Sequence, residues 1–408
     1  MPTNTILTIG MVTRELLDAF DTNRVFTKHI YNEFSSEFAQ PGAKIGPTLN
    51  VRLPARLAVT SGPVMTPSDY LEESTPLTID QQEKVGLSFT SFEMALSMDD
   101  WRKRVGEPTS IVLSNKVDAY GLGLYWKCPN AILSPSTGSA KWLAYLNAGA
   151  IMADNGAPAD GDWTAILNQY EQAQVVNENK GLFNPGTDIG TQNTRGMMGE
   201  SAGLTWYWDQ NVATHTTGAR GGTPTYTSTG TGGTSIVTGA WTAAAANRLK
   251  RGDIFTIANV YAVNPVSLNN TGQLRQFTVL ADANSDASGN ATIQIYPAII
   301  GPGSPRQTVN ALPVASAPLT MLGTANTVYH QNEVFQRQAW LMAMCRLTDP
   351  YSGEASYATD STSGVAIRTW RSSDIINDAH LSRADIAFGV APGRPEWCVR
   401  VWSTPPTL

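Results

Sequence analysis

The spacing of apolar residues near the N-terminus is helical. Over residues 11–38 the apolar positions recur every three or four residues rather than alternating, and such spacing is typical of an amphipathic helix. The positions are Leu16, Leu17, Phe20, Val25, Phe26, Ile30 and Phe34. We therefore expect a broken amphipathic helical arm.

Alternation replaces this spacing in the next segment. It predicts two strands, 49–59 and 85–92, on either side of a stretch rich in Pro, Ser and Thr. The strands are expected to form a long two-stranded arm. Because an isolated two-stranded ribbon is only marginally stable in water, we expect a neighbouring subunit to cover it.

Three helices are predicted after this arm. Asp99 and Asp100 are candidate N-caps, and Pro108 suits the first turn of a long helix that ends before Cys128 and Pro129. Two further helices are expected at 140–153 and 163–176, joined by a Gly- and Pro-containing linker.

The stretch LTWYWDQNVATHTTG, residues 204–218, predicts a strand followed by a turn. In a strand over 204–209, the side chains of Leu204, Trp206 and Trp208 share one face. We expect this face to lie in a sheet core, with both tryptophans buried. Residues 209–211 are then a turn, and His215 caps the exit into the Gly- and Thr-rich segment that follows.

Composition changes abruptly at residue 218. The segment 218–239 is almost entirely Gly, Thr and Ser, and helical periodicity stays absent to about residue 325. Strands are predicted at 254–263, 277–281 and 291–296. We interpret 218–325 as an all-β module inserted into a mixed domain, which resumes near residue 328. The fold class is α+β.

Composition and charge narrow the function. The chain has 408 residues, 42% of them hydrophobic, which is typical of a globular protein. Only 15% are charged, against roughly 25% in soluble proteins, which favours a surface covered by partners. The net charge of −6 argues against binding nucleic acid by phosphate neutralisation. No signal peptide or long apolar run is present, so we expect synthesis in a cytosol and no membrane span.

Candidate chemistry is sparse. The cysteines Cys128, Cys345 and Cys398 have no CxxC spacing, which indicates neither a zinc site nor a disulfide framework. The four histidines are dispersed, and packing or capping roles are expected for His29, His215, His330 and His380. The tripeptide at 251–253 reads Arg-Gly-Asp but is expected to be turn chemistry before a strand. We expect no catalytic, cofactor-binding or metal-binding residues.

Several stretches, in one order along the chain, resemble the major capsid proteins of tailed phages with the Hong Kong ninety-seven fold. VRLPARLAVTSG with STPLTIDQQEKVGLSFTSFEMALSMDDW resembles the extended arm, or E-loop, and LSNKVDAYGLGLY resembles the spine helix. GLFNP with GESAGLTWYWDQNVATHTTG resembles a strand of the A domain. YHQNEVFQRQAWLMAMCRL and SRADIAFGVAPGRPEWCVRVW are similar to the closing strands. LKRGDIFTIANVYAV falls where the P-twenty-two-like coat proteins carry an inserted I domain.

The resemblance implies a domain organisation. It divides the chain into an N-terminal arm (1–45), an E-loop with flanking P-domain strands (46–97), a P-domain spine helix (98–130), a first part of the A domain (131–217), an inserted β-rich I domain (218–325) and a return through the A and P domains (326–408).

The resemblance also implies a function. It predicts a major capsid protein that self-assembles through pentamers and hexamers into an icosahedral shell around double-stranded DNA, without sequence-specific binding and without a cofactor. The expected partners are further copies of the chain, a scaffolding protein, a portal and a decoration protein. The protein is expected to be synthesised in the host bacterial cytoplasm and to reside in the virion. Lys44 and Lys84 lie only near the base of the arm, so a shell without covalent crosslinks is expected.

Two other functions fit part of the sequence. An encapsulin-type nanocompartment shares the fold, but the insertion disfavours it. A secreted carbohydrate-binding or glycosidase β-protein is suggested by 11 tryptophans and the Thr- and Gly-rich segments. The missing signal peptide and the lack of a convergent carboxylate pair argue against that class.

Overall fold

The computed structural model describes residues 9–32, 46–53, 73–90, 105–135, 141–179, 199–228, 230–243, 247–348, 350, 353–360, 364–374, 376–377 and 379–405. The chain divides into two compact units. Unit 1 comprises Met1–Val51, Ser74–Gly121 and Trp340–Gly393, and unit 2 comprises Arg52–Glu73, Leu122–Ala339 and Arg394–Leu408.

Unit 1 is built on an antiparallel sheet whose longest strand is β19, Ala379–Pro392. This strand pairs with β3 (Gln81–Thr90), β18 (Val365–Asp374) and β16 (Trp340–Met344). β17 (Glu354–Asp360) pairs with the far edge of β18. The predicted strand 85–92 is thus present as part of β3, with residues 91–92 outside the described part of the chain.

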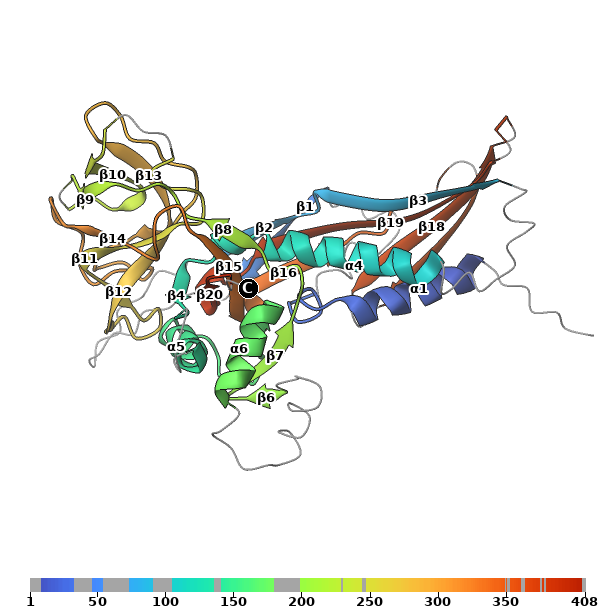
Figure 1. Cartoon of the computed structure of the whole chain (residues 1–408), viewed down its shortest axis with the longest axis horizontal. Helices are drawn as coiled ribbons and strands as arrows, with labels where there is room; N and C mark the ends of the chain where they lie inside the picture. The colour runs from blue at the N-terminus through green and yellow to red at the C-terminus, as the bar shows by residue number, and fades with distance from the viewer. Residues whose placement is uncertain are drawn as a thin grey trace, which may run out of the picture. The chain divides into compact units, whose positions relative to one another are not determined.

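Two helices of unit 1 run along this sheet (Figure 1). α1 (Ile9–Asn23) contacts β17 and β18 and buries Val12, Leu16, Leu17 and Phe20. This confirms a helical arm as far as residue 23. α4 (Glu107–Leu122) lies over β3 and β19, where the Tyr120 ring meets the Phe388 ring edge-on at 5.5 Å.

α4 is shorter than the sequence predicts. It ends at Leu122, and a separate one-turn 3-10 helix, η2 (Tyr125–Lys127), precedes Cys128. Gly121 and Gly123 bracket the break, and glycine is a poor helix former. The cap candidates Asp99 and Asp100 lie outside the described residues.

The two-stranded arm exists, and both predicted strands are present in part, but their predicted pairing with each other is wrong. β1 (Thr48–Leu53) pairs with β2 (Glu73–Thr78), whereas the predicted return strand belongs to the sheet of β19. β2 reads ESTPLT, which does not alternate cleanly, so the stronger alternation of β3 drew the prediction away from it. Residues 54–72 lie outside the described part of the chain.

Unit 2 contains a mixed sheet in the order β4, β20, β15, β5, β7, β6. The strands are β4 (Asn130–Leu133), β20 (Cys398–Ser403), β15 (Val328–Gln336), β5 (Trp163–Leu167), β7 (Leu204–Trp208) and β6 (Glu200–Ser201), and β8 (Thr214–Thr216) also pairs with β15. β4 runs parallel to β20 and β5 parallel to β7.

Two helices accompany this sheet. α5 (Lys141–Asp154) matches the prediction at 140–153. The helix predicted at 163–176 is partly wrong, because 163–167 is strand β5 and the helix α6 covers Gln169–Asn179. β5 is buried from Thr164 to Leu167, and a short, fully buried strand has no alternation by which a sequence pattern could distinguish it from helix.

The insertion forms a closed barrel. Its strands are β9 (Gly222–Tyr226), β10 (Gly233–Trp241), β11 (Ile254–Val263), β12 (Asn270–Val279), β13 (Ala291–Ile299) and β14 (Leu319–Met321), in the order β14, β11, β12, β13, β10, β9. Tyr226 closes the ring by donating its N–H to Ala317 O at 2.9 Å and accepting from Ser316 N at 2.7 Å. The three predicted strands are confirmed, β11 with its predicted limits.

The barrel has its own core, and its two chain connections to the host sheet lie next to each other. Buried side chains from all six strands fill it, among them Phe255, Phe277 and Ile293. At its ends, Thr217 N donates to Thr327 O at 3.1 Å and Asn326 N donates to Gly218 O at 3.2 Å. The chain therefore enters and leaves the barrel at one point beside β8 and β15.

Candidate assembly surfaces and the barrel joint

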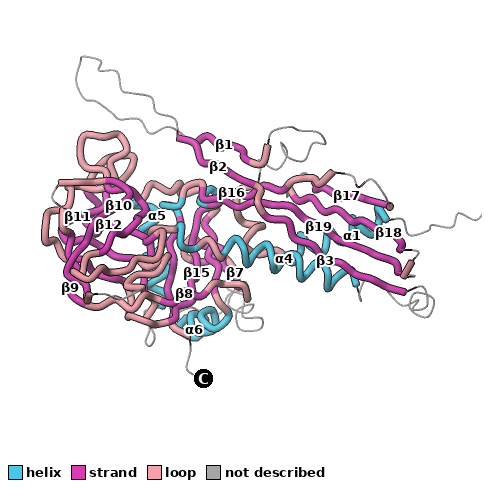
Figure 2. Tube along the Cα trace, turned by 90° about the horizontal axis from the view of Figure 1, so that it is seen from above, coloured by secondary structure: helices cyan, strands magenta, loops and turns pink. Residues whose placement is uncertain are grey.

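The root of the arm is fixed to unit 1. Val51 of β1 and Leu77 of β2 are buried against Leu341, Ala343 and Ala391. Ile79 N donates to Pro47 O at 2.9 Å, and the Thr48 and Thr78 hydroxyls are hydrogen-bonded at 2.9 Å. β1 and β2 lie side by side (Figure 2), and these contacts fix the base of the arm.

Glu73, the first residue of β2, belongs to unit 2 and forms ion pairs within that unit. The Glu73 carboxylate is 3.0 Å from Arg306 Nε, in the long loop between β13 and β14, and 3.5 Å from Arg394 Nη1. Arg394 also lies 3.7 Å from Glu396. All four side chains are at least partly shielded from water, so these ion pairs are screened less than fully exposed ones.

The joint between barrel and host sheet contains a buried histidine and aspartate. His215 Nε2 is 2.9 Å from Asp253 Oδ1, and the other carboxylate oxygen accepts from Gly218 N at 3.0 Å and Lys250 N at 2.8 Å. Both side chains are almost inaccessible, at 3% and 0%. His215 therefore does more than cap a turn, because it ties β8 to the first turn before β11.

Arg400 of β20 is the central charge of this joint. Its side chain is wholly buried and donates to Gly252 O at 2.9 Å, to Gln331 Oε1 at 3.3 Å and to Thr278 Oγ1 at 3.3 Å. Its guanidinium also lies over the rings of Tyr125 and Trp402. Burial lowers the pKa of Arg400 from its usual value, with partial compensation from nearby anionic and polarisable groups.

Polar side chains of β12 complete the joint. Gln276 pairs with the backbone of Ala131 at 2.6 and 2.7 Å, and Thr278 Oγ1 donates to Trp126 O at 3.0 Å. Arg275 Nη1 donates to Asn155 Oδ1 at 2.9 Å. A cavity of about 70 Å³ lies beside these residues, far smaller than the roughly 300 Å³ of a typical ligand site. This face is a packed joint.

The predicted histidine roles are consistent with these contacts. His330 lies on β15, where burial lowers its pKa, and His380 on β19 contacts Ser373 Oγ at 3.1 Å. His29 follows α1 and donates its backbone N–H to Phe26 O. Among the residues that the structure describes, no three His, Cys, Asp or Glu side chains gather as a metal site would require.

The Arg-Gly-Asp tripeptide is not available for adhesion. Asp253 and Gly252 are buried in the joint, and only Arg251 is exposed, stacked at 4.7 Å over the Trp126 ring. The turn interpretation is therefore confirmed.

The aromatic stripe of β7 is only partly a core stripe. Trp206 is buried and stacks on Trp142 with ring centroids 5.1 Å apart, which confirms its predicted packing. Trp208 is 46% exposed, so the prediction that it is buried is wrong. It lies at the end of β7, where the sheet core stops. Tyr170 at the start of α6 is also exposed, at 50%.

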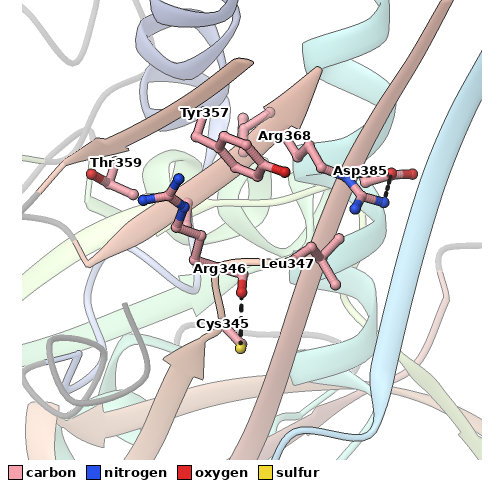
Figure 3. A pocket seen from close by; sticks show the side chains of 9 residues that line it. Cys345, Arg346, Leu347, Tyr357, Thr359, Arg368 and Asp385 are labelled. Atoms are coloured by element: carbon pink, nitrogen blue, oxygen red, sulfur yellow. Dashed lines mark hydrogen bonds and ion pairs between the residues drawn. The ribbon is translucent and has the colours of Figure 1, made fainter. Parts of the chain in front are cut away.

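A hollow in unit 1 has no room for a ligand. It lies between β17, β18 and β19, where the Arg346 guanidinium covers the Tyr357 ring at 4.3 Å and Arg368 pairs with Asp385 at 2.5 Å (Figure 3). These side chains leave no space for even a water molecule.

Exposed apolar side chains and an open strand edge remain as assembly surfaces. Leu143 and Leu146 of α5 are 52% and 39% exposed, and Ile111 and Val112 of α4 are 42% and 58% exposed. Within the described residues, β3 pairs along ten positions with β19 and with no second strand. Such edges and apolar side chains are typical of surfaces that another chain covers.

The base of the arm, the helix-covered sheet of unit 1 and the barrel of unit 2 are the main features of the chain, and the sequence comparison identifies its family. The family model described as P22 coat protein, gene protein 5, matches residues 130–400. The chain therefore belongs to the P22 coat protein family. It is a phage major capsid protein with an α+β fold, and it forms an icosahedral shell.

Solved capsid structures are similar to the chain. The capsid of cyanophage P-SCSP1u has 10% identity and a TM-score of 0.46 over 99% of this chain and 93% of that chain. The capsid of Ralstonia phage GP4 has 8% identity and a TM-score of 0.48 over 94% and 89%. The CUS-3 coat protein I-domain has 25% identity and a TM-score of 0.18 over 28% and 97%. No curated protein matches the sequence significantly.

None of the helices in the described ranges has both the length and the apolar character needed to cross a membrane.

Proposed function

We propose that this coat protein associates with copies of itself into pentamers and hexamers, and that these capsomers close into the shell around the phage DNA. The match of the coat protein family model to residues 130–400 is the observation that carries this proposal. The role is structural, and no step of it calls for a catalytic residue or a cofactor.

The arm between β1 and β2 is proposed to lie over a neighbouring subunit. The base of this arm packs on unit 1, which supports the proposal. If the arm and the N-terminal region together bury about 2,000 Å², the gross apolar contribution is tens of kcal/mol at about 25 cal/mol per Å². Lost freedom and polar desolvation offset most of it. Individual contacts are then reversible, and many together hold the closed shell.

The domain division stays a proposal of the same kind: an N-terminal arm to 45, an E-loop region to 97, a spine segment to 130, an A domain interrupted by an I domain at 218–325, and a return to 408. We assign the barrel the role of bracing the A domain during folding. The buried joint of Arg400, His215 and Asp253 supports this assignment, because barrel and host sheet each satisfy polar groups of the other.

The other partners follow from the family. We propose a scaffolding protein and a portal during assembly, a decoration protein on the finished shell, synthesis in the bacterial cytoplasm and residence in the virion. The net charge of −6 favours weak, sequence-independent contact with the enclosed DNA.

Electron microscopy of the purified chain tests assembly directly. We expect closed shells tens of nanometres across, or capsomers that close on addition of a scaffolding protein. Monomers that bind glycans would instead support the carbohydrate-binding alternative. Portal and terminase genes beside the coding sequence would separate a phage shell from an encapsulin-type compartment.

Deleting 219–324 tests the role of the barrel, provided that a second variant also replaces Arg400 by Met. The deletion removes Gly252 and Thr278 and so leaves a buried guanidinium without two acceptors. We therefore expect poor solubility for the deletion alone and also for the deletion combined with Arg400→Met, if the barrel braces folding. Full solubility and normal shells from the combined variant would contradict the bracing role.

A further inference from the structure

Cys128 and Cys398 occupy equivalent places in unit 2. Each directly follows a one-turn 3-10 helix, η2 and η4 (Pro395–Trp397), and each leads into a strand of the host sheet. Their backbones are extended, with φ and ψ of −81° and 120° for Cys128 and −119° and 139° for Cys398. Both side chains are fully buried.

The strands place these two cysteines side by side. β4 and β20 are parallel neighbours in which Asn130 pairs with Val399, so Cys398 lies one position before that pair and Cys128 two. Cys128 Sγ donates a hydrogen bond to Cys398 O at 2.8 Å. Neighbouring strands lie about 4.8 Å apart and one residue along a strand adds about 3.3 Å, so a pair offset by one position still falls within the Cα separation of roughly 4.4–6.8 Å that a disulfide spans.

A carboxylate adjoins the thiol pair. Glu333 of β15 is wholly buried, and its Oε2 is 3.9 Å from Cys398 Sγ. The guanidinium of Arg400, two residues further along β20, is the cation of this cluster. Thiol–disulfide exchange proceeds through a thiolate. In this cluster burial and Glu333 raise the pKa of the Cys398 thiol, whereas Arg400 lowers it.

We propose that Cys128 and Cys398 are a disulfide-forming pair, which closes when the coat protein meets a low-molecular-weight disulfide. In the first step Glu333 accepts the proton of the Cys398 thiol, and the thiolate attacks one sulfur of the oxidant and expels the other half as a thiolate. In the second step Cys128 loses its proton and attacks the mixed disulfide, expelling the second half. The protein gains one S–S bond, and the oxidant is reduced to two thiols.

The pair is inert while β4 stays in place. Burial raises the pKa of the Cys398 thiol well above its usual value, so the reactive thiolate is rare. β4 has only four residues and pairs with β20 alone among the described strands. Local opening of this short strand is the event that admits an oxidant, so closure is slow and mild denaturant accelerates it.

The disulfide would fasten the outermost strand of the host sheet across the whole insertion. The closed loop runs from Cys128 to Cys398 and includes α5, α6 and the barrel. Crosslinks that close long loops restrict the unfolded chain most. A coat protein made in a reducing cytoplasm and released into an oxidising medium would gain this crosslink only after release.

Incubation of the purified full-length chain with oxidised glutathione tests the pair. We expect three titratable thiols to fall to one in denaturant, a peptide linking Cys128 to Cys398 in a non-reducing digest, and faster migration of the monomer band on a non-reducing denaturing gel. The melting temperature should rise by several degrees and return with dithiothreitol. Cys345→Ser is the matched control, because it should keep the band shift and fall from two thiols to none.

Cys128→Ser and Cys398→Ser should each abolish both the band shift and the rise in melting temperature. The digest of the unsubstituted protein needs no variant to fold. Three thiols that persist after incubation with oxidant in mild denaturant would overturn the proposal. A linkage that involves Cys345, or covalent multimers without the internal peptide, would overturn it equally.

Discussion

Asp118 shows how one buried carboxylate organises the start of unit 1. It lies on α4 and accepts hydrogen bonds from Val25 N at 2.7 Å, Thr27 N at 2.9 Å and Thr27 Oγ1 at 2.7 Å. These donors belong to the turn after α1, so this side chain holds the N-terminal segment against α4. The sequence shows only an aspartate within a helical pattern, and its partners are more than 90 residues away.

Replacing Asp118 by Ala should destabilise the subunit strongly. Two buried donors of Thr27 and the partly buried N–H of Val25 would lose their acceptor, and each unsatisfied buried group costs about 1–3 kcal/mol. We expect a loss of about 3 kcal/mol or more in urea unfolding of unassembled subunits. Ile111→Ala, at a 42% exposed position of the same helix, should change stability by less than about 0.5 kcal/mol. Equal effects of the two substitutions would contradict this role.

The Asp118 carboxyl also predicts how the stability of the subunit depends on pH. Burial raises the pKa of Asp118 above its usual 3.8, although its hydrogen bonds and Arg24 oppose the shift. An acid whose pKa is higher in the folded state costs stability when ionised, and this cost vanishes as pH falls through the raised value towards 3.8. Between pH 7 and pH 4, the unsubstituted chain should therefore gain stability relative to Asp118→Asn. A constant difference across this range would refute it.

Arg400 is the second residue whose role depends on distant partners. Arg400→Met should cost about 3–5 kcal/mol, because it leaves the buried acceptors of the joint without their donor. Arg337→Met, at an exposed position of unit 2, is the matched control and should be nearly neutral. Thermal unfolding followed by tryptophan fluorescence measures both. Nearly equal melting temperatures would show that the joint contributes little.

At the scale of elements, the pattern of the chain predicted those segments whose two faces differ. α1, β11 and the Leu204–Trp206 part of β7 expose one side and bury the other, so their periodicity is visible. β5 is buried on both sides and was predicted as helix, and β2 lacks alternation and was missed. The joint between the barrel and the host sheet could not be predicted. Arg400 lies in one sheet and Thr278 in another, and only the packing of these sheets brings the two side chains together.

The barrel should fold without the rest of the chain. Its strand ring is closed and its core is its own. We expect a fragment covering 218–325 to give a dispersed amide spectrum and one cooperative melting transition. A fragment that stays unfolded would mean that the barrel needs the host sheet.

Gly218→Ala should lower the melting temperature of the full chain, since an added Cβ would lie 2.3 Å from Arg248 O.

At the scale of the whole molecule, the shell is expected to be held without covalent bonds between subunits. Lys84 lies exposed on β3, and Lys44 lies outside the described residues. Shells heated in denaturing detergent with reductant should yield monomers on a gel. A ladder of multimers under these conditions would contradict the prediction. An internal Cys128–Cys398 bond would not add multimers, so the two proposals can fail separately.

The adjacent ends of the barrel have a further consequence, for genetics rather than for stability. Because Thr217 and Thr327 are hydrogen-bonded neighbours, a coding sequence placed between them adds a domain without lengthening or redirecting the host chain. This position is thus an insertion site that would accept another domain whose termini lie close together. Such a graft would succeed most readily in a host that also carries a neutral residue at position 400.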